Sequence, residues 1–208
     1  MKKLAIIGSG DLAEQIAVLA TQTGLFEVVG FINQPVEIVL TSYPIIGTDD
    51  DVLNLYESDQ IDCISIGIGY AHFSLRERLY NRFVNQIPLA IIIHPTCYVD
   101  ETAKVGEGCV LYPGCTVGMN SVIEDNVLLN TAVVICHDDI IQKNSYISPA
   151  CNIAGEVRIG SRCMIGIGTT IIDHKSICEV VIIGAGAVVI SDITISGTYV
   201  GVPAKKIK

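Results

Sequence analysis

The stretch IGIGTTIIDHKSICEVVIIGAGAVVI, residues 165–190, carries an aliphatic side chain at every sixth position. The same spacing runs without insertion or deletion through eighteen consecutive positions that are all Ile, Leu or Val. Self-similarity at a fixed period indicates a repeat architecture, and it outweighs local propensity. The repeated positions are Ile93, Val99, Val105, Leu111, Val117, Ile123, Leu129, Ile135, Ile141, Ile147, Ile153, Ile159, Ile165, Ile171, Ile177, Ile183, Val189 and Ile195.

Small side chains dominate two residues before each aliphatic position, and glycine often follows it. This hexapeptide repeat suits a β-solenoid in which each short strand points one aliphatic side chain inward, onto its counterpart in the next coil. Three six-residue sides resemble the left-handed parallel β-helix, so residues 93–208 are predicted to form an all-β domain of about six coils. The small residues, five of them cysteines, are Cys97, Ala103, Cys109, Cys115, Ser121, Val127, Val133, Ser145, Cys151, Val157, Cys163, Thr169, Val181 and Ala187.

The first 92 residues follow a different pattern, in which apolar strands alternate with amphipathic helices. The predicted strands are KLAII (3–7), FEVVGFINQ (26–34), DCISIGIG (62–69) and LAIII (89–93). Strands that alternate with helices imply a small parallel sheet. We therefore expect an α/β Rossmann-like domain over residues 1–92.

A glycine-rich turn follows the first predicted strand, where Gly8, Gly10 and Ala13 form G-x-G-x-x-A. In this context the glycines let the backbone approach a phosphate, and the following helix offers free N–H groups and its positive dipole end. A tight turn without a ligand is the alternative. Asn33 stands where a dinucleotide-binding domain has an acidic residue for the ribose, which argues against a redox dinucleotide.

Composition excludes several classes of protein. The net charge of −9 argues against binding to nucleic acid or to anionic lipid. No run of about 18 apolar residues predicts a membrane span. Gly8, Gly10 and Asp11 interrupt the N-terminal apolar run before a signal peptide could form, so a cytoplasmic location is expected. The eight cysteines include no C-x-x-C pair, and we interpret them as buried thiols in a reducing compartment.

His137 is the histidine with the most informative position in the repeat. It follows the inward-pointing Ile135 by two residues, so its side chain is expected to face outward. One coil of 18 residues above it lies Gly155, at a strand spacing of about 4.8 Å. The imidazole would then face a backbone amide that could donate to an oxyanion. An exposed histidine without a catalytic role is the alternative.

Several motifs resemble one family of enzymes. They are IIGSGDLAEQI (6–16), GYAHFSLRERL (69–79), IHPTCYV (93–99), ICHDDIIQKNSYISPACNIAGEVRIGSRCMIGIGTTI (135–171), IIGAGAVVI (182–190) and YVGVPAKKI (199–207). This set is similar to the sugar acyltransferases that join a Rossmann-like domain to a left-handed β-helix. The resemblance implies acetyl-CoA as co-substrate and N-acetylation of a UDP- or dTDP-linked 4-amino-4,6-dideoxy sugar. O-acetylation of a sialic acid or related sugar is the alternative.

The resemblance also implies roles for individual residues. His137 matches the general base and Asp138 the acidic residue beside it, although adjacent residues on a strand point apart. Tyr146 and Leu12 each replace a histidine found in some members. The residues expected to bind acetyl-CoA are Tyr146, Gly155, Ile167, Ala185, Pro203, Ala204 and Lys205. The residues expected to bind the nucleotide sugar are Gly8, Ser9, Gly10, Asp11, Leu12 and Asn33.

The implied reaction is direct acyl transfer with a histidine base, without a metal or a covalent intermediate. Two other classes compete. A metal-dependent β-helix enzyme of the carbonic anhydrase type needs three converging histidines, and His94, His137 and His174 offer no closely spaced pair. A catalytically silent scaffold or sugar-binding module is the second.

Apolar residues at outward positions predict association. Val133, Val134, Ile140 and Ile172 are assigned to the outer faces of the solenoid, and symmetric contacts would bury them. A homotrimer with active sites at the subunit interfaces is therefore expected.

Overall fold

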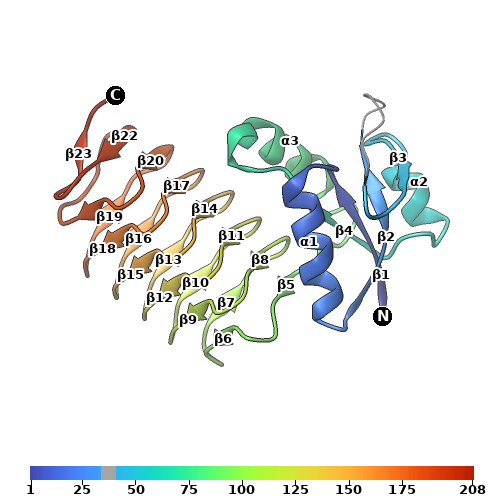
Figure 1. The fold of residues 1–208 in the computed structure, drawn as a ribbon, viewed down its shortest axis with the longest axis horizontal. Coiled ribbons are helices and arrows are strands. Elements are labelled where there is room, and N and C mark those ends of the chain that lie inside the picture. The colour runs from blue at the N-terminus through green and yellow to red at the C-terminus, as the bar shows by residue number, and fades with distance from the viewer. Residues whose placement is uncertain (34–40) are drawn as a thin grey trace. The chain divides into compact units, whose positions relative to one another are not determined.

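Two units make up the chain, Met1–Ile93 and His94–Lys208. The computed structural model describes residues 1–33 and 41–208, so Gln34, at the end of the predicted second strand, lies outside the described residues. Figure 1 shows helices and a sheet in the first unit and a stack of short strands in the second.

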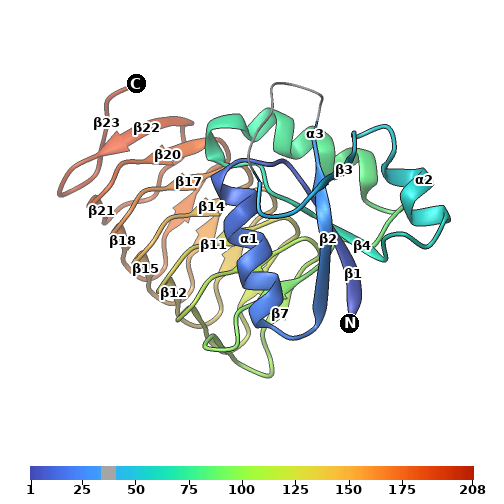
Figure 2. The same ribbon diagram turned by 45° about the vertical axis from the view of Figure 1, so that its right-hand side comes forward.

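In the first unit, a parallel sheet has the strand order β3-β2-β1-β4. Helix α1 lies beside β1 and β2 (Figure 2). Its apolar face, which packs on these strands, contains Ala13, Ile16 and Ala20. The elements are β1 (Lys2–Ile7), α1 (Asp11–Gln22), β2 (Phe26–Ile32), β3 (Ile45–Gly47), α2 (Val52–Glu57), β4 (Cys63–Ile66), the 3₁₀ helix η1 (Tyr70–His72), α3 (Phe73–Phe83) and β5 (Ile92–Ile93).

The second unit is a left-handed β-helix, which confirms the predicted fold class. Its strands are β6 (Tyr98–Val99), β7 (Lys104–Val105), β8 (Val110–Leu111), β9 (Thr116–Val117), β10 (Val122–Ile123), β11 (Leu128–Leu129), β12 (Val134–Ile135), β13 (Ile140–Ile141), β14 (Tyr146–Ile147), β15 (Asn152–Ile153), β16 (Arg158–Ile159), β17 (Met164–Ile165), β18 (Thr170–Ile171), β19 (Ser176–Ile177), β20 (Val181–Ile183), β21 (Val188–Val189), β22 (Gly197–Val200) and β23 (Lys205–Lys206).

These strands stack in three parallel sheets. One runs β6-β9-β12-β15-β18-β21, the second β7-β10-β13-β16-β19, and the third includes β8-β11-β14-β17-β20-β22. Before the last coil, each rung pairs with residues 18 positions further on, as Val134 does with Asn152 and Ile135 with Ile153. The aliphatic spine is therefore continuous, and its side chains from Leu111 to Val189 are buried.

The repeat changes register after Val189. Ile195 was predicted to point inward, but its side chain is 61% exposed, whereas Ile193 is 5% exposed and bridges to Ile177. Ile183 likewise pairs with Tyr199, 16 residues on. The last coil is two residues shorter than the others, so Ile193 takes the inward position that the six-residue count assigns to Ile195.

The expectation that Val133 points outward is wrong, because the side chain is 0% exposed. Val133 lies two residues before Ile135, at a corner where the other hexads also turn a small side chain into the interior. Val134, Ile140 and Ile172 are half-buried, as their outward positions predict.

None of the helices in residues 1–33 and 41–208 has the length and apolarity needed to cross a membrane. All eight cysteines are free thiols. The corner cysteines Cys109, Cys115, Cys151 and Cys163 are buried, as is Cys63, whereas Cys97, Cys136 and Cys178 are half-buried and depart from the expectation of buried thiols.

Candidate active site

The turn between β12 and β13, residues 136–139, carries His137 and Asp138. Ile135 anchors the turn in the core, and the His137 side chain two residues later is 55% exposed. Asp138 has a φ of +58°, in the left-handed region. This backbone bend breaks the alternation of an extended strand. The two adjacent side chains can therefore meet.

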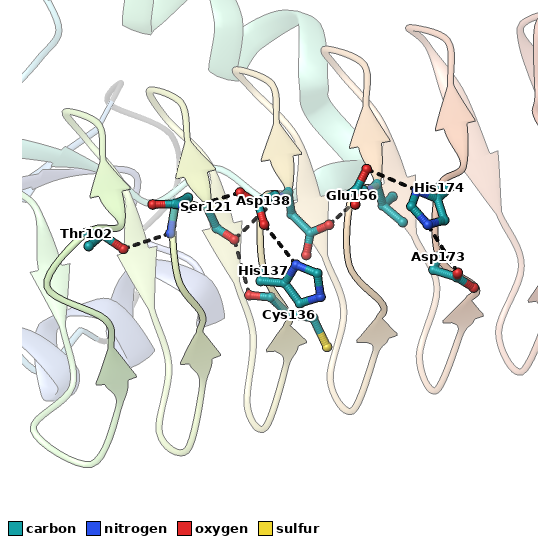
Figure 3. Close-up of polar contacts among 11 residues, drawn as sticks. Thr102, Ser121, Cys136, His137, Asp138, Glu156, Asp173 and His174 are labelled. Carbon is teal, nitrogen blue, oxygen red and sulfur yellow. Dashed lines mark hydrogen bonds and ion pairs between the residues drawn. The ribbon is translucent and has the colours of Figure 1, made fainter.

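His137 and Asp138 form a hydrogen-bonded pair (Figure 3), in which Nδ1 and Oδ2 are 2.9 Å apart. Asn120, one coil below, donates through Nδ2 to the other carboxylate oxygen at 3.0 Å. An ionised carboxylate only accepts, so Nδ1 carries the proton and Nε2 keeps its lone pair. Asn120 and Asp138 thus fix both the orientation and the tautomer of the imidazole.

The pair shifts the pKa values of both groups. The hydrogen bond from His137 holds the pKa of Asp138 below its usual value, with help from Asn120. The hydrogen bond to Asp138 raises the pKa of His137, and the charges of Asp138 and Glu156 act in the same direction. His137 is therefore a stronger base than a free imidazole.

Gly155 lies over the His137 ring. A Cβ added to Gly155 would come within 2.5 Å of both Cε1 and Nε2 of the imidazole, so only glycine leaves room for the ring there. Within the described residues, the Gly155 N–H makes no hydrogen bond. The arrangement therefore places a proton acceptor, Nε2, beside an unused amide donor.

Two of the residues assigned to acetyl-CoA, Ile167 and Ala185, occupy equivalent turns of neighbouring coils, where Gly186 N–H donates to the Ile167 carbonyl. Both are exposed, Ile167 by 58%. They precede β18 and β21, while His137 and Gly155 follow β12 and β15 of the same sheet. The two groups therefore lie at opposite ends of the strands of one sheet.

Pro203, Ala204 and Lys205 form the C-terminal turn and the start of β23. Ala204 N–H donates to the Val188 carbonyl in β21, which holds this turn against the same sheet as Ile167 and Ala185. Tyr146 lies apart from these residues, because β14 belongs to another sheet. Its hydroxyl accepts a hydrogen bond from Asn130 Nδ2 at 3.1 Å.

The residues assigned to the nucleotide sugar surround the start of α1 in the first unit. Gly8 has a φ of +107°, and a Cβ there would come within 2.9 Å of the Gly67 carbonyl oxygen. Gly10 has open space around it. Asn33 Nδ2 donates to Ser9 Oγ at 2.6 Å, which ties the end of β2 to this turn. Asp11 is exposed and Leu12 half-buried in the first turn of α1.

Arg76 is a residue near this turn that the sequence patterns did not single out. It is 1% exposed, and its Nη1 donates to the carbonyls of Ile66 and Ile68 at 2.8 and 3.2 Å. The loop that it holds packs against Gly8 through Gly67 and Ile68. A buried arginine in an amphipathic helix carries no sequence signal beyond its position among apolar neighbours.

Glu156 lies one coil above the His137 turn and His174 two coils above it, and His174 Nδ1 is 3.0 Å from Glu156 Oε2 (Figure 3). Asp173 lies 3.5 Å from the other ring nitrogen. Within residues 1–33 and 41–208, no group of three or more His, Cys, Asp or Glu side chains is placed to hold a metal ion.

Two family models match the chain. Residues 3–83 match the PglD N-terminal domain, and residues 93–208 match the GMPPB C-terminal domain. The boundary between the two matches lies between the last helix of the first unit and the start of the solenoid repeat.

Solved structures resemble the chain over its full length. The acetyltransferase domain of PglB from Neisseria gonorrhoeae FA1090 is 30% identical, with 100% of both chains covered and a TM-score of 0.91. Its complex with acetyl coenzyme A gives 30% identity, 99% coverage of both chains and the same TM-score of 0.91.

Two further structures are similar. GDP-perosamine N-acetyltransferase from Caulobacter crescentus, as a histidine-to-alanine mutant in complex with CoA and GDP-perosamine, is 29% identical. The match covers 99% of this chain and 96% of that chain, with a TM-score of 0.90. WeeI from Acinetobacter baumannii AYE shares the fold at 23% identity, with 99% of both chains covered and a TM-score of 0.83.

Proposed function

Because this chain belongs to the hexapeptide-repeat sugar acetyltransferase family, we propose that it transfers the acetyl group of acetyl-CoA to the amino group of a nucleotide-linked sugar. The observation that carries the proposal is the juxtaposition of His137 Nε2 with the unused Gly155 N–H. A base and an oxyanion donor at one point are the two groups that acyl transfer requires.

His137 acts as the general base. Its Nε2 accepts a proton from the sugar amine while the amine nitrogen forms a bond to the acetyl carbon. Asp138 stabilises the imidazolium that results, because its carboxylate already accepts the Nδ1 proton. A positioned base of this kind contributes about 10²- to 10⁴-fold to the rate.

The Gly155 N–H donates to the oxygen of the acetyl group as negative charge develops on it. When the tetrahedral intermediate collapses, the carbon–sulfur bond breaks and the imidazolium returns its proton to the sulfur of CoA. The imidazole is then neutral again and ready for the next acceptor. Protons and electron pairs balance without an additional group.

Acetyl-CoA supplies the acetyl group as a thioester. Ile167 and Ala185 present exposed apolar surface suited to its pantetheine arm, and the exposed Lys205 offers a cation to its phosphates. Tyr146 lies on a different sheet from His137, which argues against its contact with the same acetyl-CoA within one chain.

For the nucleotide part of the acceptor, we assign the turn from Gly8 to Ala13. The open space at Gly10 and the N-terminus of α1 are suited to a diphosphate, and the Ser9–Asn33 hydrogen bond orders the turn. The family resemblance implies UDP- and dTDP-sugars as acceptors, and the Caulobacter relative adds GDP-perosamine to the acceptors that need testing.

The test is an acceptor screen with acetyl-CoA, with products read by mass. UDP-, dTDP- and GDP-linked 4-amino sugars are compared with their 4-hydroxy counterparts and with the free amino sugars. We expect one acetyl group to be added to a nucleotide-linked amine. Acetylation of the hydroxy sugars alone would instead support the O-acetyltransferase, and equal acetylation of free monosaccharides would contradict a nucleotide-sugar acceptor.

A further inference from the structure

Several turns of the solenoid share a backbone hydrogen bond that is made by the corner residue. The corner residue is the one that lies two positions before each aliphatic residue of the spine. In several hexads the N–H of the corner residue donates to the carbonyl three residues before it. Examples are Cys97 to His94, Ala103 to Asp100 and Ala187 to Gly184. This bond closes the turn from within.

Ser121 and Ser145 replace this backbone bond in the coil above them, because each hydroxyl accepts the corner N–H of that coil. Ser121 Oγ accepts the N–H of the next corner residue, Asp139, at 3.2 Å and donates to the Cys136 carbonyl, also at 3.2 Å. Ser145 does the same with Cys163 N–H at 3.1 Å and the Gly160 carbonyl at 3.0 Å. Each hydroxyl thus accepts from residue i+18 and donates to residue i+15, as Figure 3 shows for Ser121 and Cys136.

Asp139 occupies the same kind of corner, with its side chain 0% exposed. Its Oδ1 accepts the N–H of Val157, residue i+18, at 2.7 Å. The carbonyl equivalent to those of Cys136 and Gly160 belongs to Ala154, residue i+15. Within the described residues, neither Asp139 Oδ2 nor the Ala154 carbonyl has a hydrogen-bond partner.

One proton on Asp139 Oδ2 would give both unpartnered acceptors a hydrogen bond, since Oδ2 could then donate to the Ala154 carbonyl. An ionised carboxylate cannot donate, and a buried polar atom without a partner is costly. A proton on Oδ2 would give Asp139 the double role that the two serines have. Burial raises the pKa of Asp139 to about 7, against the opposing effects of the Val157 N–H and the Cys136 backbone.

The titratable groups around this corner are few. Cys136, His137 and Asp138 come from its own turn, and Glu156 comes from the coil above. The coil below presents the uncharged Asn120 and Ser121. Asp138 and burial favour the neutral acid, whereas a charged His137 would favour the carboxylate.

The Ala154 carbonyl belongs to the same peptide group as the Gly155 N–H. We propose that Asp139 is a neutral carboxylic acid whose Oδ2–H donates to the Ala154 carbonyl, and that it thereby orients and polarises the peptide whose N–H stabilises the oxyanion. Asp139 is then a positioning residue, and this role rests on the proposed function. Donation to a carbonyl strengthens the N–H of the same peptide as a donor, because hydrogen bonds in a chain polarise one another.

This role predicts an alkaline loss of activity. The active form carries a protonated Asp139 and a neutral His137, so kcat/KM should fall below the pKa of His137 and again above that of Asp139. Above the second pKa, the carboxylate repels the Ala154 carbonyl and the peptide loses its fixed orientation.

Two variants separate the proton from the shape of the corner. Asp139→Asn keeps an acceptor for Val157 and a donor for Ala154, but it cannot ionise, so the alkaline loss should disappear. Asp139→Val copies Val157 and Val133, which fill other corners. It removes the donor, and kcat should fall about tenfold, the value of one hydrogen bond, with an unchanged KM for the acceptor.

Infrared difference spectra of wild type and Asp139→Asn test the proton without turnover. A carboxylic acid C=O band at pH 6 that is absent from the variant supports the proposal. Absence of the band overturns it, as does an unchanged alkaline limb in Asp139→Asn or an unchanged kcat in Asp139→Val. A wild-type protein that acetylates no acceptor would overturn the proposed function and the positioning role with it, whereas the band would separately decide the protonation of Asp139.

Discussion

At the scale of single residues, the site depends on the Asp138 carboxylate, which the bent backbone of its turn brings to His137. Asp138 reaches His137 because its φ is +58°, and Asn120 holds it from below. The pair leaves Nε2 as the basic nitrogen. Asp138 therefore sets the pH range in which His137 can accept a proton.

Replacement of Asp138 by Asn should move this range. The hydrogen bond to Asp138 is the main cause of the raised pKa of His137, so the variant's imidazole should have a lower pKa. The acid limb of kcat/KM should then shift to lower pH. Asp173→Asn, which removes an exposed carboxylate beside His174, is the matched control and should leave the limb in place. An acid limb that stays fixed in Asp138→Asn would show that this pair does not govern the base.

Gly155→Ala should impair transfer although it adds a single methyl group. The new Cβ would lie 2.5 Å from the His137 ring, so the imidazole must move away from the amide. We expect turnover to fall by about two orders of magnitude, the scale of losing a positioned base. Gly114→Asn is the control, since asparagine occupies similar left-handed turn positions at Asn120 and Asn126. Normal turnover in Gly155→Ala would argue against the proposed geometry.

At the scale of elements, the spine can be tested where its register changes. Ile193 is 5% exposed and Ile195 61% exposed, although the six-residue count favours Ile195 as the inward residue. Ile193→Ala should lower the free energy of unfolding by about 2 kcal/mol or more, through a cavity. Ile195→Ala should change it by less than about 0.5 kcal/mol. Denaturant unfolding of both variants measures the difference, and the opposite order would place the wrong isoleucine in the core.

The sequence predicted the solenoid because a six-residue period is a property of the coil itself. The shortened last coil was not predictable by counting, since strand hydrogen bonds, not residue numbers, decide that Ile193 stacks on Ile177. The period also located His137 below Gly155. It could not place Asp138 beside His137, because that contact requires a left-handed φ.

Asp139 shows a second limit of pattern analysis. It follows two exposed polar residues and looks like part of a surface loop, yet it lies two positions before Ile141, at a corner that faces inward. That spacing was the available signal. Arg76 offered no comparable signal, because its role depends on carbonyls in another segment of the chain.

At the scale of the whole molecule, the exposed apolar residues of the solenoid predict a homotrimer. Ile182 and Ile190 are 44% and 48% exposed, and Val134, Ile140 and Ile172 are half-buried at outward positions. Symmetric association would bury such surface. Sedimentation velocity should give a single species of three chains, and a monodisperse monomer with full activity would rule the trimer out.

The account as a whole depends on His137 as the base for acetyl transfer, and turnover of His137→Ala tests that directly. The side chain is outward, so the variant should unfold at the same denaturant concentration as wild type. His174→Ala, at an exposed histidine two coils above, is the control and should retain normal turnover. With acetyl-CoA and the acceptor identified by the screen, we expect the His137→Ala rate to fall by about two or more orders of magnitude. A folded His137→Ala enzyme with near-normal turnover at neutral pH would contradict the mechanism.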